Sequence, residues 1–312
     1  MASAAGETPR NSGRLESMTL PQPAPLVLRG RRFDAARPAV MGIINRTPDS
    51  FYPPARHLEL DDALSRAASM ISEGVDIIDV GGVRAGQEGD WVTEAVEIDR
   101  VRPFLVALRL AHPELLISLD TWRAEVADAC AGLVDLVNDT WAGADAGLVA
   151  VAAEQGAGYV VSHTGGLAPR TDPTGVNYGP GDGVVEHVLS GLAEGAKRAV
   201  SGGVASEAVL VDPTLDFGKR TVDSLRLVAA TGRFLALGHP VLMAISRKDF
   251  VGETLDLPAD ERLEGTLAAT AVAAWQGATV FRAHDVRATR RVVDMVASIR
   301  GDRAPLRSER GS

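Results

Sequence analysis

From Pro38 onward the chain repeats one pattern, in which a short apolar run ends in polar or glycine residues and a stretch with helical spacing of apolar positions follows. The apolar runs are aliphatic or β-branched and have the length of buried strands. They predict eight strands, at Ala39–Asn45, Val75–Gly81, Leu115–Asp120, Val134–Asp139, Gly158–His163, Ala208–Asp212, Pro240–Ser246 and Ala278–His284. The stretches between them predict eight helices, at Leu58–Ser72, Thr93–Ala111, Arg123–Ala131, Ala144–Gln155, Gly183–Ser201, Val222–Ala236, Glu261–Gln276 and Val286–Ile299.

Strict alternation of buried strands and helices is typical of an α/β fold with a parallel sheet, and eight such units predict a (β/α)8 barrel. An open doubly wound sheet is the alternative. Residues Leu26–Phe33 alternate as a hairpin, which we expect to plug the amino-terminal end of the barrel. We therefore expect one (β/α)8 barrel domain over residues 26–300, with the hairpin at its start. Residues 1–25 are interpreted as a disordered leader and 301–312 as a flexible tail, because both are rich in small and polar residues.

Composition narrows the class of partner. The chain has 46% hydrophobic and 23% charged residues and a formal net charge of -9, which argues against a nucleic-acid partner. No apolar run approaches the roughly 18 residues that span a bilayer, so no membrane partner is expected. Cys130 is the only cysteine, which excludes an intrachain disulfide and fits a cytoplasmic protein.

The predicted strand ends carry the candidate chemistry, because parallel barrels build their sites there. Capping of the next helix explains any single Asp or Asn, but it does not explain a whole ring of polar ends. The ring consists of Asn45, Asp79, Asp120, Asn138, Asp139, His163, Asp212, Ser246-Arg247-Lys248, Arg282 and His284.

Two chemistries are visible in this ring. The acceptors and the amide of Asp120, Asn138 and Asp212 suit a planar amidine-like edge, such as that of a 2-amino-4-oxopteridine. Arg282 and His284 are two residues apart on one strand, so they point the same way and suit a phosphate or diphosphate group.

Several phrases of the ring resemble the signatures of the dihydropteroate synthase family, in the same order, over Pro38 to Arg300. They are Gly42-Ile43-Ile44-Asn45-Arg46-Thr47-Pro48-Asp49-Ser50-Phe51, Ser118-Leu119-Asp120-Thr121, Val137-Asn138-Asp139, Asp212-Pro213, Phe217-Gly218-Lys219, Ser246-Arg247-Lys248 and Arg282-Ala283-His284-Asp285-Val286.

The resemblance implies a (β/α)8 fold and a transferase that joins 6-hydroxymethyl-7,8-dihydropterin diphosphate to 4-aminobenzoate in folate biosynthesis, with Mg²⁺ as cofactor and a homodimer as assembly. It implies ligands of the pterin or aminobenzoate type, including sulfonamides and sulfones. It assigns the pterin ring to Asp120, Asn138, Asp212 and Lys248, the metal and diphosphate to Asn45, and the leaving anion to Arg282 and His284. Such a reaction relies on orientation and electrostatic support, so no catalytic nucleophile is assigned.

The chain departs from the family pattern in its loops. Arg46 replaces a small apolar residue, and we expect it to fill space that substrate needs. The second family loop, Gly-Gly-Glu-Ser-Thr-Arg-Pro-Gly, is replaced by Gly81-Gly82-Val83-Arg84-Ala85-Gly86-Gln87-Glu88-Gly89. Thr214 and Asp216 replace glycines, which we expect to close off positive φ and to place an anion near the diphosphate.

These departures favour a homologue with degenerate first and second loops and little or no synthase activity, similar to the inactive second dihydropteroate synthases of actinobacteria. A working dihydropteroate synthase is the alternative. A pterin-dependent methyl transferase shares the barrel, but methyl transfer releases no diphosphate and needs no anion site. A barrel that serves only as a partner-binding subunit is a further alternative.

Overall fold

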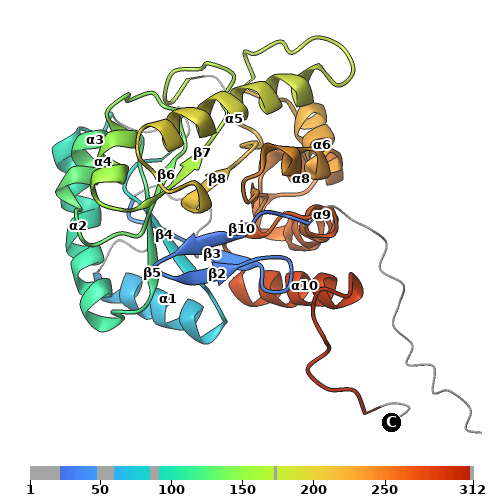
Figure 1. The fold of residues 1–312 in the computed structure, drawn as a ribbon, viewed down its shortest axis with the longest axis horizontal. Coiled ribbons are helices and arrows are strands. Elements are labelled where there is room, and N and C mark those ends of the chain that lie inside the picture. Colours follow the sequence, from blue (N-terminus) through green and yellow to red (C-terminus); the bar gives the residue numbers. More distant parts are fainter. Residues whose placement is uncertain (1–21, 48–59, 85–90, 172–173, 310–312) are drawn as a thin grey trace, which may run out of the picture.

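The computed structural model describes residues 22–47, 60–84, 91–171 and 174–309. Its centre is a parallel sheet of eight strands in the order β8-β7-β6-β5-β4-β3-β10-β9 (Figure 1). A parallel bridge between Val211 and Val241 joins the two edges of this sheet. The sheet therefore closes into the predicted barrel, and the open doubly wound alternative is wrong. The strands are β3 (Ala39–Asn45), β4 (Ile77–Gly81), β5 (Leu116–Asp120), β6 (Leu136–Asp139), β7 (Gly158–Val161), β8 (Val209–Val211), β9 (Leu242–Ala244) and β10 (Val280–Ala283).

Helices surround the strands, and α9 and α10 pack side by side (Figure 1). The α-helices are α1 (Leu60–Ser72), α2 (Glu94–Ala111), α3 (Ala124–Ala129), α4 (Leu148–Glu154), α5 (Gly183–Ser201), α6 (Thr221–Ala229), α7 (Thr231–Phe234), α8 (Asp249–Leu255), α9 (Leu263–Trp275) and α10 (Val286–Ile299). Short 3-10 turns lie at Ser206–Ala208, Leu235–Leu237 and Ala259–Glu261.

Several predicted helices are shortened at their ends, and two helical regions differ in the number of helices. The helix expected over Val222–Ala236 is divided into α6, α7 and a 3-10 turn, and at the break the Thr231 hydroxyl donates to the backbone carbonyl of Val228 at 2.8 Å. The helix α8 is not predicted from the sequence, because its seven residues are too few to show a helical period.

An antiparallel hairpin of β1 (Leu26–Leu28) and β2 (Arg31–Phe33) packs on the inner layer of the barrel. Its Leu26, Leu28 and Phe33 side chains are buried together with the first inward-facing residues of the barrel strands. These inward-facing residues include Met41, Ile77, Leu116, Leu136, Val160, Leu210, Leu242 and Val280. Because apolar side chains fill the amino-terminal end, the carboxyl end is left for polar chemistry.

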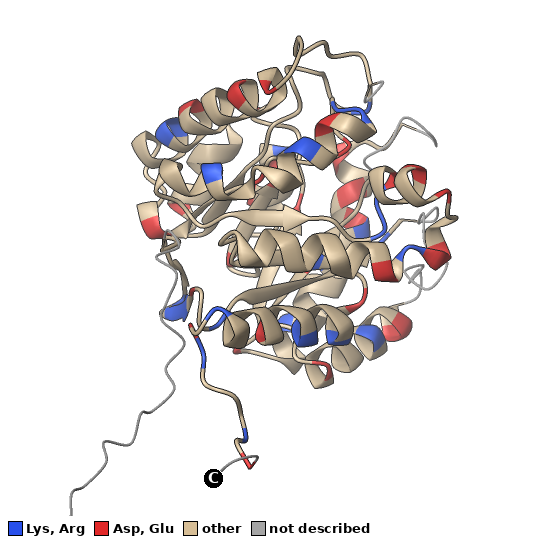
Figure 2. Cartoon of the chain, turned by 90° about the vertical axis from the view of Figure 1, so that its right-hand side faces the viewer, with Lys and Arg blue, Asp and Glu red and all other residues tan. Residues whose placement is uncertain are grey.

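Acidic and basic residues are interspersed over the helices (Figure 2). None of the described helices is long and apolar enough to cross a membrane. Residues 301–309 form neither helix nor strand. Most of the predicted leader (1–21), much of the two altered loops (48–59 and 85–90) and the last three residues lie outside the described part of the chain.

Candidate functional site

Strand register brings several predicted site residues to one level at the carboxyl end of the barrel. Asn45 pairs with Gly81, Gly81 with Asp120, and Asp120 with Asn138. A Cβ atom on Gly81 would lie 3.6 Å from Asn45 Oδ1 and 3.7 Å from Asp120 Oδ2. The amide of Asn45 and the carboxylate of Asp120 therefore both face the bare backbone of Gly81.

The Arg282 guanidinium connects the carboxylates of this ring. Its Nε donates to Asp79 Oδ2 at 2.6 Å, and a terminal nitrogen donates to Asp120 Oδ2 at 2.5 Å. Asn138 Nδ2 donates to the same Asp79 oxygen at 3.2 Å, and the Thr140 hydroxyl donates to Asp120 Oδ1 at 2.5 Å. The structure thus brings Asp120, Asn138 and Arg282 into one hydrogen-bond network, in which Asp79 accepts from both Asn138 and Arg282.

Burial and neighbouring charges act against each other in this network. Burial raises the pKa of Asp120 to about 6, although the Arg282 charge opposes the shift. Burial also raises the pKa of Asp212, against the opposing charge of Lys248. Burial acts to lower the pKa of Arg282, but the carboxylates of Asp79 and Asp120 outweigh it and raise that pKa. Arg282 therefore stays a cation, held by two acidic partners.

The turn after β8 holds Asp212 through a dense set of hydrogen bonds. Asp212 Oδ1 accepts from the Thr214 backbone N–H at 2.7 Å, and the Thr214 hydroxyl donates to the Asp212 carbonyl at 2.9 Å. The same hydroxyl oxygen accepts from the His163 N–H at 3.0 Å. These contacts fix the direction of the Asp212 side chain at the end of its strand.

The expectation that Thr214 and Asp216 exclude positive φ is wrong. Thr214 has φ 53° and Asp216 has φ 68°, so both adopt the left-handed conformation that glycine favours. Asp216 is fixed there because its Oδ1 accepts from the Ser224 hydroxyl at 3.0 Å and its Oδ2 accepts from the Phe250 N–H at 3.2 Å. Side-chain hydrogen bonds thus retain a turn shape that the residue types disfavour by about 1–2 kcal/mol each.

Lys248 of the ring and Lys219, which follows β8, both bind backbone carbonyls. Lys248 Nζ donates to the Leu215 carbonyl at 2.5 Å and lies 5.0 Å from the centroid of the Phe217 ring. Lys219 Nζ donates to the carbonyls of His163 at 2.6 Å and Phe217 at 2.7 Å. Burial lowers the pKa of Lys219 to about 7. Lys248 therefore binds the 212–219 turn at Leu215, and Lys219 joins the end of that turn to Phe217 and to His163.

The two histidines of the predicted ring occupy different places. His284 lies beside Arg282, with its Nδ1 3.2 Å from the Ser246 hydroxyl, and burial lowers its pKa to about 4. It is therefore neutral near pH 7, and Arg282 alone carries charge in that pair. His163 is buried on the outer side of β7, where its Nε2 lies 2.9 Å from Nδ1 of His187 on α5.

Two arginines also point away from the ring. Arg46 donates through Nε to the Arg100 carbonyl at 3.4 Å, and its guanidinium carbon lies 5.6 Å from the Phe104 ring centroid on α2. These contacts place the Arg46 side chain against α2. Arg247 donates through Nε to Asp285 at 2.8 Å, so it braces the start of α10.

Comparison with known proteins identifies the family. The family model described as pterin binding enzyme matches residues 41–284. The chain belongs to this family. It is 53% identical over 91% of its length to a Mycobacterium leprae protein named inactive dihydropteroate synthase 2, of which 98% is covered. The family predicted from the sequence is thus confirmed.

Solved dihydropteroate synthases share the fold of this pterin-binding family member. A Yersinia pestis dihydropteroate synthase in complex with a sulfonamide drug superposes with a TM-score of 0.82 at 32% identity, covering 89% of this chain and 100% of that one. A Coxiella burnetii dihydropteroate synthase in complex with pteroic acid gives 0.79 at 31% identity, covering 89% and 99%.

Proposed function

We propose that this protein binds a pterin-type ligand in the ring around Arg282 and has little or no dihydropteroate synthase turnover. The observation that carries the proposal is the network in which Asp79 and Asp120 accept hydrogen bonds from the Arg282 guanidinium while the Asn138 amide donates to Asp79. With Asp212 beside them, these groups supply the acceptors that a 2-amino-4-oxopteridine edge requires.

The hydrogen-bond partners and the protonation of the basic side chains support low turnover. Departure of a diphosphate needs positive groups that face the developing charge. Arg282 is instead bound by two carboxylates, and Lys248 donates to a backbone carbonyl. His284 is neutral, because burial lowers its pKa to about 4. The name of the M. leprae relative, which describes that protein as inactive, agrees with this proposal.

A working synthase is the second candidate. It is supported by the shared fold and by about a third of residues identical to solved dihydropteroate synthases. The ligands named for those two proteins, a sulfonamide and pteroic acid, support extending the proposed ligand class to aminobenzoate-like and sulfonamide or sulfone compounds.

Magnesium is proposed as a cofactor only together with a phosphorylated ligand. The described residues contain no group of three or more His, Cys, Asp or Glu side chains that could hold a metal. Asn45 offers one amide oxygen toward the ring. Mg²⁺ commonly takes one or two protein oxygens and completes its shell with phosphate oxygens and water, so Asn45 fits as one ligand. When bound, the ion would neutralise part of the diphosphate charge.

We further propose a homodimer in the cytoplasm. Val272 on α9 and Met295 and Ile299 on α10 are 46%, 61% and 51% exposed, and the two helices pack side by side. Such an apolar face favours an interface with a second copy. The cytoplasmic setting rests on Cys130, which is buried and free.

Two measurements test the function. Purified protein is given dihydropterin diphosphate, 4-aminobenzoate and Mg²⁺, and diphosphate release is followed. No release above background is expected, whereas turnover on the order of one per second, ordinary for an enzyme, would establish the second candidate.

Calorimetry with 6-hydroxymethylpterin tests the ring. Heat is expected from the wild type and none from Asp212→Ala. Asp62→Ala, on the exposed first turn of α1, is the control and should bind as the wild type does. Equal heat from the wild type and Asp212→Ala would show that the ligand does not bind at the ring.

A further inference from the structure

Thr140, the first residue after β6, places its hydroxyl beside the ring. The hydroxyl donates to Asp120 Oδ1 at 2.5 Å, and the other carboxylate oxygen, Oδ2, accepts from Arg282 at 2.5 Å. Within the described part of the chain, Asp120 is the only hydrogen-bond acceptor of this hydroxyl. Each oxygen of Asp120 thus has one fixed donor and keeps capacity for a second. Because the Asp120 side chain is 20% exposed, a ligand can use that capacity.

The charge of Asp120 is set by groups on several surrounding elements. Burial raises its pKa to about 6, and the Arg282 cation on β10 opposes this shift. The carboxylates of Asp79 on β4 and Glu97 on α2 raise the pKa, whereas the Thr140 hydrogen bond lowers it. Arg282 is shared with Asp79, so the Thr140 hydroxyl is the donor that serves Asp120 alone. Near pH 6 this hydrogen bond therefore helps to decide whether Asp120 is ionised.

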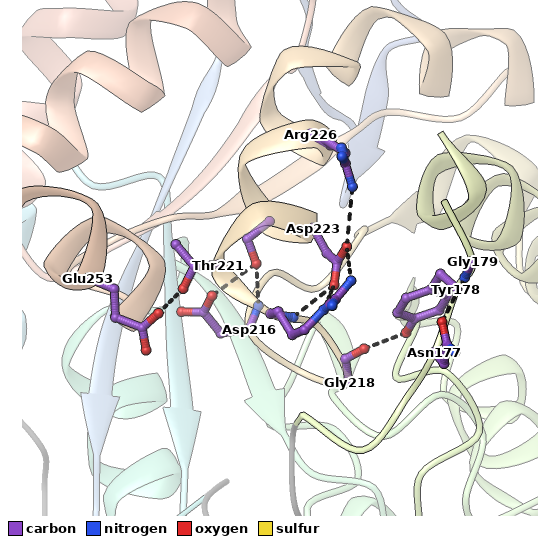
Figure 3. Close-up of polar contacts among 11 residues, drawn as sticks. Asn177, Tyr178, Gly179, Asp216, Gly218, Thr221, Asp223, Arg226 and Glu253 are labelled. Atoms are coloured by element: carbon purple, nitrogen blue, oxygen red, sulfur yellow. Dashed lines mark hydrogen bonds and ion pairs between the residues drawn. The ribbon is translucent and has the colours of Figure 1, made fainter. Parts of the chain in front are cut away.

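Other acidic residues at this end of the barrel are used inside the fold (Figure 3). Asp216 Oδ1 accepts from the Ser224 hydroxyl at 3.0 Å. Asp223 accepts from Arg220 Nε at 2.9 Å, and its side chain is 2% exposed. Protonation of either residue would disturb the turn before α6. Protonation of Asp120 instead changes a group that faces the ring.

We propose that Thr140 is a positioning residue for ligand binding, whose hydroxyl keeps Asp120 ionised and so extends binding to lower pH. The inference rests on the proposed pterin-type function and concerns the regulation of that site by protons. The amidine edge of a 2-amino-4-oxo heterocycle donates hydrogen bonds, and an ionised carboxylate accepts them more strongly than a neutral carboxyl group does. A protonated carboxyl group also has its own O–H donor, which opposes the N–H donors of that edge. The hydroxyl of Thr140 therefore favours the form of Asp120 that binds.

The test compares the wild type with Thr140→Val, which keeps the size and branching of the side chain and removes the donor. The affinity for 6-hydroxymethylpterin is measured by calorimetry at pH 7.5 and pH 5.5. Loss of a hydrogen bond to a charged group should move the ionisation of Asp120 upward by about one pH unit. The wild type should then bind more tightly than the variant by less than about twofold at pH 7.5 and by about eightfold at pH 5.5. Other groups that titrate in this range, such as Lys219, are the same in both proteins and do not affect this ratio.

Three further variants separate the hydroxyl from the structure around it. Thr140→Ala also lacks the donor and should behave as Thr140→Val does. Thr140→Ser keeps the hydroxyl and should match the wild type at both pH values. Thr254→Val removes the hydroxyl of an exposed residue of α8, which donates to the Phe250 carbonyl at 2.6 Å, and it should also match the wild type. Thermal unfolding shows whether each variant is folded.

A second measurement needs no ligand. The carbon-13 NMR signal of the Asp120 carboxyl group, identified by its absence in Asp120→Asn, is titrated in the wild type and in Thr140→Val. The midpoint is expected at about pH 6 in the wild type and about one pH unit higher in the variant. Equal midpoints would overturn the inference whether or not a ligand binds.

The outcomes distinguish this inference from the function beneath it. If the wild type binds no pterin at either pH, the proposed function fails, and the effect of Thr140 on ligand binding fails with it. If the wild type binds and its affinity ratio to Thr140→Val is the same at both pH values, only the inference fails, because an equal loss at both pH values indicates a purely structural role.

Discussion

Arg282 Nε lies 2.6 Å from Asp79 Oδ2, although 203 residues separate the two in the chain. The pair forms because β10 and β4 are the two neighbours of β3 in the barrel and both side chains point inward. Asp79 is fully buried and the Arg282 side chain is 18% exposed. A buried charge is tolerated only with its partner in place, so each residue depends on the other.

Arg282→Ala should therefore lower the free energy of unfolding by about 3–5 kcal/mol, because it leaves Asp79 and Asp120 without their cation. Urea denaturation followed by circular dichroism measures this loss. Arg287→Ala, at an exposed position of α10, is the matched control and should change stability by less than about 0.5 kcal/mol. Equal stability of Arg282→Ala and wild type would show that the ion pair is not formed.

The hairpin at the opposite end of the barrel gives a second prediction. Phe33 is fully buried under the first inward-facing layer. Phe33→Ala should cost about 3–5 kcal/mol of unfolding free energy through lost burial and the cavity left behind. Pterin affinity should be retained in the folded variant, because the ring lies at the other end. Arg32→Ala, whose side chain is 60% exposed, should leave both quantities unchanged, and wild-type stability of Phe33→Ala would contradict the plug.

The barrel itself was predictable because every strand is an apolar run with a polar end. The β3 strand begins and ends at the predicted residues, and the others are shortened by one or more residues at one or both ends. Backbone pairing between neighbouring strands stops where the chain leaves the barrel. The sequence alone does not mark the residue at which that happens.

The contacts of the ring were less predictable. His163 was placed among the inward side chains, yet counting alternate positions from Val161, which is buried under the helices, puts it on the outer face. The role of Asp79 as the partner of Arg282 depends on barrel closure, which pairs residues far apart in sequence. The left-handed Thr214 and Asp216 depend on hydrogen bonds to His163, Ser224 and Phe250, which no local pattern reveals.

Magnesium provides a third prediction. If Asn45 supplies the single protein oxygen, millimolar Mg²⁺ should not change the melting temperature of the protein alone or with 6-hydroxymethylpterin. It should raise the melting temperature only when the diphosphate ester is present, because the ester completes the coordination shell. Adding EDTA should reverse that rise, and Asn45→Ala should abolish it. A rise with Mg²⁺ alone would indicate a metal site that does not depend on phosphate.

The last prediction concerns pH and the buried His163, whose Nε2 lies 2.9 Å from Nδ1 of the exposed His187. Burial lowers the pKa of His163 to about 3, whereas an unfolded histidine has a pKa of about 6.5. Below pH 6.5 the unfolded chain therefore binds a proton that the native protein does not, so native stability falls as the pH falls. From pH 7 to pH 5 the contribution of this one residue should fall by about 2 kcal/mol.

His163→Phe removes this contribution, and urea denaturation at pH 7 and pH 5 measures it. The difference in unfolding free energy between wild type and His163→Phe should shift by about 2 kcal/mol in favour of the variant at the lower pH. Tyr178→Phe alters the same aromatic cluster, 6.1 Å from the His163 ring, without changing a group that titrates in this range. Its difference from wild type should be the same at both pH values. A constant difference for His163→Phe as well would mean that His163 gains its proton in the folded protein near pH 6 and is not held neutral by burial.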